Sequence, residues 1–158
     1  MEGRLMNRFD VKVAHKNTLP VFFIEYKNSA KILVVSRKDI QRYDFELVLG
    51  SQLILSANSD LELVNIELMW QKPTRKEICF IDSTTKGTIV FPHLQLLCNM
   101  NFADSEPRAS YDRNNSLLHI SIDCNNYTHT ECVMFSTNCY ALINKGKLIG
   151  FQFVVKNL

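Results

Sequence analysis

The sequence has little glycine, and its glycines lie far apart. A phosphate-binding loop needs several glycines within a few residues, so that the backbone can approach the phosphate oxygens. No such cluster exists, and no Gly-x-Ser-x-Gly turn is present to hold a serine nucleophile. Both absences argue against enzyme activity. The glycines are Gly3, Gly50, Gly87, Gly146 and Gly150.

Long apolar runs and clusters of one charge are missing as well. No segment approaches the roughly 18 apolar residues of a membrane span, and the charges near the N-terminus precede no apolar run, so neither a span nor a signal peptide is expected. The chain carries 18 Lys and Arg against 16 Asp and Glu, with a net charge of +2. The basic residues are scattered, whereas affinity for a phosphate backbone needs clustered cations. Direct binding of nucleic acid is therefore not expected.

The usual spacings of metal ligands do not occur. There is no His-x-His pair and no Cys-x-x-Cys pair. His15 and His93 stand alone, and a site built from His119, His129 and Glu131 is conceivable without any spacing that supports it. No metal and no cofactor are expected.

Cysteine is present in an odd number and is widely spaced. The five residues stand mostly in apolar, strand-like contexts. Buried thiols of this kind are typical of a reducing compartment, so an intracellular protein with free cysteines is predicted. The cysteines are Cys79, Cys98, Cys124, Cys132 and Cys139.

Short stretches of alternating apolar residues recur from end to end. Hydrophobic residues make up 46% of the chain and charged residues 22%, as in a soluble globular protein, and 158 residues suit a single domain. Period-two alternation bounded by polar turns predicts strands, and ten or more short strands predict an all-β sandwich or barrel. The predicted strands cover residues 9–13, 21–24, 32–35, 43–49, 53–55, 61–70, 78–81, 88–91 and 117–122.

Two segments depart from this pattern. Ser36 is placed to cap a short helical connector over residues 36–41. Residues 101–115 are rich in turn formers and predict an exposed loop. Trp70 lies among apolar neighbours, and two interpretations stay open for it: a core residue or the anchor of an interface.

Residues 135–156 have the layout of a β-hairpin that closes a barrel. A strand with Tyr140 and Leu142 leads into a tight turn at Gly146, and a long alternating strand follows. On this alternation one side of the last strand fills the interior and the other side faces outward. The inner side is Ile149, Phe151, Phe153 and Val155, and the outer side is Leu148, Gln152 and Val154.

This hairpin resembles the end of the cupin domain of centromere protein C. Residues 86–92 resemble the Gly-apolar-Pro segment that opens that barrel, and residues 117–122 resemble the strand that follows it. The turn glycine and proline of the family's hairpin are replaced near Thr137 and Phe135, and its basic nucleosome-binding motif is absent. The resemblance implies a cupin-type double-stranded β-helix, a jelly-roll barrel, in one domain of residues 1–158. Residues 86–156 would form its core and residues 1–80 additional strands.

The same resemblance implies a function. It predicts a non-enzymatic homodimerisation module of an inner-kinetochore scaffold in the nucleus, which recruits a partner such as the chaperone that deposits the centromeric histone. Tyr140 stands where the closing hairpin of a cupin enzyme would supply a metal ligand. The residues expected to close the barrel are Tyr140, Leu142, Ile149, Phe151 and Phe153. The residues expected at the dimer or partner interface are Leu148, Gln152, Val154 and Trp70.

Two other interpretations remain open. One is a monomeric intracellular β-sandwich, such as a viral host-range factor, that binds a host protein through loops like residues 101–115. The other is a metal- or sugar-binding cupin enzyme, which would need His119 or His129 to find further ligands. An outer face with Leu148 and Val154 predicts that Leu148→Glu or Val154→Glu gives a folded monomer, and a packing of the N-terminal strands on that face would predict a two-layered monomer instead.

Overall fold

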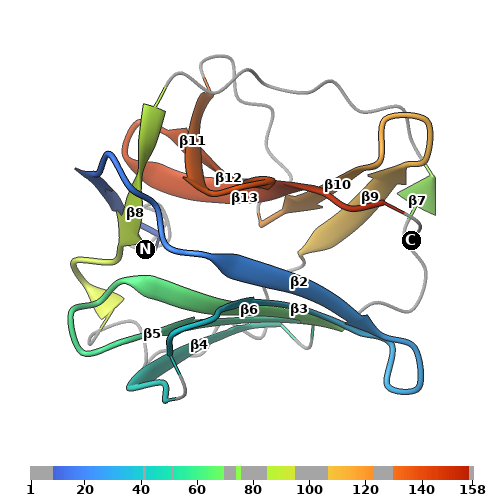
Figure 1. The fold of residues 1–158 in the computed structure, drawn as a ribbon, viewed down its shortest axis with the longest axis horizontal. Coiled ribbons are helices and arrows are strands. Elements are labelled where there is room, and N and C mark those ends of the chain that lie inside the picture. Colours follow the sequence, from blue (N-terminus) through green and yellow to red (C-terminus); the bar gives the residue numbers. More distant parts are fainter. Residues whose placement is uncertain are drawn as a thin grey trace, which may run out of the picture.

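The computed structural model describes residues 9–40, 42–50, 52–69, 74–75, 85–94, 107–122 and 130–156. These residues form two β-sheets that face one another, with the C-terminal strands in one layer and β2 to β6 in the other (Figure 1). The all-β class predicted from the alternating pattern is confirmed, in the form of a jelly-roll-like sandwich of two sheets. The described strands do not close into a barrel.

The first sheet has eight strands in the order β1-β8-β11-β12-β13-β10-β9-β7. Its neighbours are antiparallel except for the pairs β8–β11 and β7–β9, which are parallel. The strands are β1 (Lys12–His15), β7 (Thr74–Arg75), β8 (Thr85–Val90), β9 (Arg108–Asp112), β10 (Leu117–Ser121), β11 (Glu131–Ser136), β12 (Cys139–Asn144) and β13 (Lys147–Val154).

The second sheet has five antiparallel strands in the order β2-β3-β6-β5-β4. Its chain is continuous from Phe22 to Met69, and the connection between β3 and β4 has to pass β6 and β5. The strands are β2 (Phe22–Lys27), β3 (Ile32–Arg37), β4 (Phe45–Leu49), β5 (Leu53–Ala57) and β6 (Leu63–Met69). The part of the sequence that was assigned to additional strands therefore supplies a complete layer of the sandwich.

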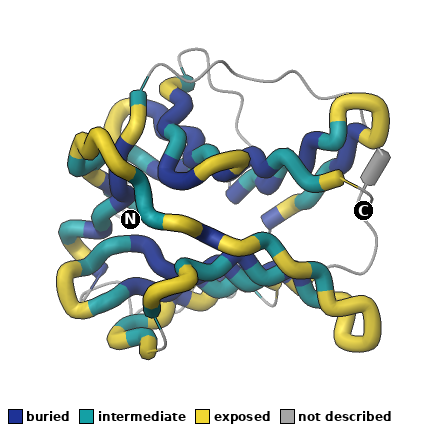
Figure 2. Tube along the Cα trace, viewed as in Figure 1, coloured by how far each residue is buried: buried dark blue, intermediate teal, exposed yellow. Residues whose placement is uncertain are grey.

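One hydrophobic core fills the space between the sheets, and it draws residues from both of them. Figure 2 shows the buried residues along the facing strands and the exposed ones mainly at the turns. Phe22 of β2 meets Phe135 of β11 edge to face, with ring centroids 5.1 Å apart. Phe151 and Phe153 of β13 pack against the same Phe135 ring at 6.2 and 6.4 Å. Aromatic rings from both layers thus interlock in the centre of the sandwich.

Hydrogen bonds also join the two layers directly. The Phe22 N–H donates to Ser136 Oγ at 3.0 Å, and this hydroxyl donates to the Pro20 carbonyl at 2.9 Å. Near Leu61, the Phe91 N–H donates to the Leu61 carbonyl at 2.9 Å. The sheets are therefore connected by backbone groups as well as by packing.

The N-terminal segment pairs with the last hairpin. The Val11 N–H donates to the Gly146 carbonyl at 2.9 Å, and the Leu148 N–H donates to the Phe9 carbonyl at 2.7 Å. Lys145 and Gly146 form the tight turn between β12 and β13, with φ angles of 50° and 76°. Two consecutive positive φ angles are the signature of a type I′ hairpin turn, which favours glycine.

The register of this hairpin contains a β-bulge. Leu142 is opposite Gly150, but Ile143 is opposite Leu148, so Ile149 has no partner on β12. An unpaired residue shifts the alternation by one, and side chains before and after it exchange faces. In β13 the residues that point to the core are consequently Leu148, Phe151 and Phe153.

Several expectations about single elements are corrected. The segment at residues 101–115 contains the strand β9, in which Tyr111 is buried and its hydroxyl donates to the Val155 carbonyl at 2.7 Å. Ser36 ends up in β3 instead of capping a helical turn. The predicted strand at residues 78–81 lies outside the described residues.

Candidate functional site

The residues expected to close a barrel divide between two faces of the eight-stranded sheet. Phe151 and Phe153 are fully buried in the core, as expected. Ile149 is the half-buried residue of the bulge. In β12 the residues of the core are Cys139, Ala141 and Ile143, and these alternate with Tyr140 and Leu142. Tyr140 does not point into the core between the sheets, because the inward positions of β12 are the odd-numbered ones. Leu142 is buried as expected, at 2% exposure, but on the other face of the strand.

The residues expected on the outer face of β13 do not form an exposed surface. Leu148 is buried in the core, and its expected place on the outer face is wrong because of the bulge at Ile149. Gln152 does point away from the core, but it is 1% exposed and its Nε2 lies 3.3 Å from His119 Nδ1 of β10. Val154 is half-buried. Trp70 lies outside the described residues.

The structure gives no support to a metal centre in the part of the chain that it describes. His119 lies on β10 with Gln152 beside it, Glu131 is at the exposed start of β11, and His129 is outside the described residues. The described residues contain no group of three His, Cys, Asp or Glu side chains that could hold a metal ion. The interior of the sandwich at the hairpin is filled by phenylalanine rings instead.

Cys139, the core cysteine of β12, has a raised pKa, whereas an activated thiol has a lowered one. Burial raises the pKa of the Cys139 thiol to about 12. Burial, followed by the nearby Cys132 and Cys139 thiols, raises the pKa of the Tyr140 hydroxyl. A nucleophile needs a lowered pKa, so neither group is prepared to attack a substrate at neutral pH.

The outer face of the five-stranded sheet is where large apolar side chains meet solvent. Val21, Phe23, Val48 and Met69 are 57%, 51%, 49% and 51% exposed. Each lies next in sequence to residues that point into the core, so all four belong to the opposite face. Among the described residues these are the exposed large hydrophobics, and they are spread over the outer face of the five-stranded sheet from β2 to β4.

Cross-strand register connects some of these side chains into a surface. A single row runs across all five strands from Glu25 through Val34, Glu67 and Ile54 to Val48. In the next row Ile32 is opposite Met69. We call this surface the outer patch and define it by its apolar members, which are Ile32, Val34, Val48, Ile54 and Met69.

Acidic side chains lie among the apolar ones. Glu25 and Glu67 belong to the row just described, and Glu46 points to the same face from β4. Burial, together with the charges of Glu67 and Glu46, raises the pKa of the Tyr43 hydroxyl, which places this side chain near both carboxylates. Within the described strands of this sheet, Lys27 is the lysine that points to the same face as these three carboxylates. The outer patch is thus apolar with carboxylates within and beside it, while Lys38 Nζ lies over the exposed Phe23 ring, 5.3 Å from its centroid.

A buried polar pair lies on the same face. The Asn65 side chain is 1% exposed and its Nδ2 donates to Ser56 Oγ at 3.4 Å, while its Oδ1 is buried and finds no hydrogen-bond partner in the structure. Polar pairs of this kind cost free energy when an acceptor is left unsatisfied. Asn65 therefore marks the part of this face that the chain covers, in contrast to the exposed outer patch.

The outer patch was missed by the sequence analysis, although a signal for it exists. The stretches Ile32 to Val35 and Leu53 to Leu55 are continuously apolar, where a strand with one solvated face should alternate. A continuously apolar strand carries apolar side chains on both of its faces. Strand propensity alone accounts for such a run equally well, so the pattern does not by itself predict a second apolar face.

The described residues include no helix with the length and hydropathy that crossing a membrane requires. Comparison with protein-family models found no match, and comparison with curated protein sequences found none either.

Proposed function

We propose that this protein is a non-enzymatic interaction module that binds another polypeptide through the outer face of its five-stranded sheet. The observation that carries the proposal is the outer patch, in which half-exposed Val48 and Met69 share a face with Ile32, Val34 and Ile54. Exposed Val21 and Phe23 lie on the same face at the β2 edge. Contiguous exposed apolar surface with a polar surround is typical of protein interaction sites. The filled interior of the sandwich leaves the outer surfaces as the place for recognition.

The charges around the outer patch define the chemistry of the partner. Glu67 lies within it and Glu25 and Glu46 lie beside it, and like charges brought together across an interface oppose association. The complementary surface is apolar with basic residues at its rim. A second copy of the chain that docked by the same face would bring carboxylates opposite carboxylates.

The proposal is tested by a photo-reactive amino acid placed at Val48. Crosslinking in cells that express the protein is expected to capture a partner there, and much less of it from the same group at Thr137, an exposed turn residue in the other sheet. The purified partner should then bind Val48→Lys/Met69→Lys at least about tenfold more weakly, because both changes put a charge into the apolar contact. The control His93→Lys/Thr137→Lys adds the same charges at exposed positions elsewhere and should bind normally. Equal capture from both positions, or equal binding by both double variants, would contradict the proposal.

The resemblance to the cupin domain of centromere protein C gives the proposal a more specific form. In that form the protein is a homodimerising scaffold of the inner kinetochore, located in the nucleus, and its partner is a factor that assembles the centromeric histone. The last hairpin supports this version of the proposal, and among the described residues of the expected interface Val154 is the one that keeps some exposure. Sedimentation equilibrium tests this version of the proposal. The parent protein is expected to be a dimer, and Val154→Glu is expected to be a folded monomer.

A monomeric β-sandwich, such as a viral host-range factor, is the second candidate. The carboxylates within and beside the outer patch favour it over self-association by that face. A mass that stays monomeric over a hundredfold range of concentration, together with partner capture at Val48, would support this candidate and count against the homodimer.

A further inference from the structure

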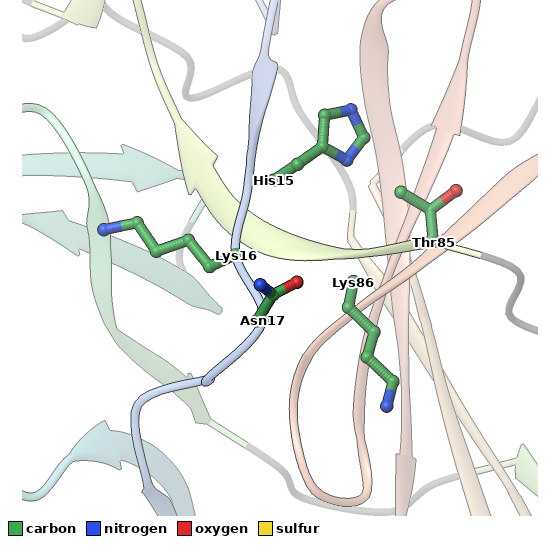
Figure 3. A pocket seen from close by; sticks show the side chains of 5 residues that line it. All are labelled: His15, Lys16, Asn17, Thr85 and Lys86. Atoms are coloured by element: carbon green, nitrogen blue, oxygen red, sulfur yellow. The ribbon is translucent and has the colours of Figure 1, made fainter.

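Two features of the described surface remain without a role: a depression between β1 and β8, and the open edge of β2. The depression has a volume of about 520 Å³, and its two lysines, Lys16 and Lys86, extend to different sides (Figure 3). Lys16 Nζ lies 4.0 Å from the Glu62 carboxylate. The two positive charges do not converge on one ligand, so the edge of β2 is the feature that defines a contact.

β2 is an edge strand of the five-stranded sheet. Its neighbour on one side is β3, and none of the described strands lies on its other side. The Lys38 N–H donates to the Val21 carbonyl at 2.9 Å. Since hydrogen bonds alternate along an antiparallel pair, the odd-numbered residues of β2 bond to β3, and the backbone groups of the even-numbered ones face the open edge. The Phe22 N–H agrees with this parity, because it leaves the sheet and donates to Ser136 Oγ.

The strand leads away from the eight-stranded sheet. The contact at Ser136 is at the first residue of β2, and the turn at the other end, residues 28–31, is exposed throughout. Figure 2 shows this turn at the lower right of the molecule, on the side of the five-stranded sheet. The edge of β2 is thus used by the other layer at its start, and the rest of the strand runs towards solvent.

Glu25 and Lys27 carry opposite charges on the outer face of this edge. Both are exposed, and they lie two residues apart in one strand, so their side chains point to the same face. Within the described residues neither of them forms an ion pair. A strand with this pattern is complementary to a second copy of itself that runs in the opposite direction, because the order of the two charges is then reversed.

The two charges also select one register. With the two-fold axis at Tyr26, Glu25 of each copy is opposite Lys27 of the other, and two ion pairs form on the outer face. An axis at Glu25 or at Lys27 would place like charges opposite each other. An axis at Ile24 would place Glu25 opposite the Phe23 ring. The complementary register uses residues 24–28 and leaves the start of β2 to its contact with the other layer.

We propose that two copies of the protein associate by antiparallel pairing of β2, through residues 24–28 of each. The addition of a strand to an exposed sheet edge is a recurrent mode of recognition, and a contact between identical strands closes with two-fold symmetry. The pair joins the two five-stranded sheets into one continuous sheet. Its outer face then carries the outer patches of both copies, so a partner with two binding segments gains from binding both.

Sedimentation equilibrium between about 1 μM and about 1 mM tests the proposal, because a single pair of strands buries little surface and associates weakly. The parent protein is expected to dimerise in this range. Glu25→Lys and Lys27→Glu each place like charges opposite each other at two positions, and each should weaken dimerisation at least about tenfold. The double variant Glu25→Lys/Lys27→Glu restores opposite charges and should dimerise like the parent. Circular dichroism confirms that the variants are folded.

Two control variants separate this contact from others. Glu46→Lys makes the same change of charge on β4, at the other edge of the sheet, and should leave dimerisation unchanged. Val154→Glu alters the last hairpin, so a dimer formed by β2 should survive it. Hydrogen exchange reports on the backbone: the Ile24 amide, which faces the edge, should exchange more slowly as the dimer forms, and the Phe23 amide, which faces β3, should not change.

A monomer throughout the concentration range, equal weakening by Glu46→Lys, or a double variant no tighter than the single ones would overturn the proposal. A dimer that is lost in Val154→Glu and kept in Glu25→Lys would overturn it as well, because the interface would then lie at the last hairpin. The outer patch takes no part in the contact. Val48→Lys/Met69→Lys is therefore expected to dimerise normally, and the two proposals succeed or fail separately.

Discussion

At the scale of single residues, Ser136 has a role out of proportion to its size. Its hydroxyl accepts the Phe22 N–H and donates to the Pro20 carbonyl, so one side chain of the eight-stranded sheet satisfies two backbone groups at the start of β2. Ser136 is 2% exposed and Phe22 is 7% exposed, so water does not readily replace it. The loss of such a partner leaves a buried donor unsatisfied.

Ser136→Ala is therefore expected to lower the free energy of unfolding by about 1–3 kcal/mol. Urea unfolding followed by circular dichroism measures the change. The neighbouring Thr137 is exposed, and Thr137→Ala is expected to stay within about 0.5 kcal/mol of the parent. Equal effects of the two substitutions would show that the bond to Phe22 contributes nothing.

Cys139 predicts a dependence of stability on alkaline pH. The pKa of its thiol rises from 9.0 to about 12 on folding because of burial. The folded state therefore resists loss of the proton, and the stability that this group contributes is fully present below pH 9 and is lost as the pH rises from 9 towards 12. Between those limits the free energy of unfolding should fall by up to about 1.4 kcal/mol per pH unit more steeply than in Cys139→Ala.

Urea titrations of both proteins between pH 8 and 10.5 provide the measurement. Parallel pH profiles would refute the assignment, whatever the difference in absolute stability. Alkylation gives a second observable, since Cys139 should react with iodoacetamide only as fast as the protein unfolds.

At the scale of elements, the bulge in β13 and the close contact of this strand with β10 decide how the last hairpin is used. Gly150 follows the bulge, and a Cβ atom there would collide with the Ile120 carbonyl oxygen of β10. The obstacle is backbone, which cannot move aside as a flexible side chain does. Gly150 therefore sets the distance between the two strands in the centre of the sheet.

Gly150→Ala is expected to lower the free energy of unfolding by about 2 kcal/mol or more, because the sheet must distort to admit the methyl group. Gly146→Asn is the control: Gly146 has a φ of 76° and open space around it, and asparagine tolerates that conformation better than other residues. The control is expected to cost less than about 1 kcal/mol. A comparison of thermal unfolding of the two variants decides the matter, and a harmless Gly150→Ala would show that β10 can shift.

The sequence was sufficient for the class of fold and for most of the strands, because each strand has its own alternating pattern. It was insufficient wherever one extra residue shifts the alternation of inward and outward side chains. Ile149 is an ordinary apolar residue in an apolar run, and nothing local distinguishes a bulge there; yet this bulge moves Leu148 into the core. β9 was missed because Tyr111 is its one large apolar residue, and its burial depends on a partner strand. The outer patch depends on register between five strands, which no single strand encodes.

At the scale of the whole molecule, both sheets depend on one core. The core includes Leu33 and Leu55 of the five-stranded sheet and Leu118 and Phe151 of the eight-stranded sheet. Each sheet alone would expose an apolar face to water, and neither has another layer of described residues on that side. A domain of this construction unfolds as a unit.

Hydrogen exchange is thus expected to give the same free energy of opening for amides at the centre of both sheets. The pairs to compare are Leu33 with Leu118 and Leu55 with Phe151, all of them fully buried in the core. The free energies of opening within each pair are expected to agree within about 1 kcal/mol. Ser136→Ala is expected to lower both members of each pair equally. A five-stranded sheet that remains protected while the other exchanges would indicate two independent units.

The pairing of the N-terminal segment with the last hairpin has a consequence for synthesis on the ribosome. Phe9 and Val11 find their backbone partners at Leu148 and Gly146, which are translated long after them. The strands of the five-stranded sheet, by contrast, are all complete once Met69 has emerged. The growing chain accordingly carries the five-stranded layer, with residues 9–11 still unpaired, until β13 leaves the exit tunnel, and this interval is when a chaperone would be most useful to it.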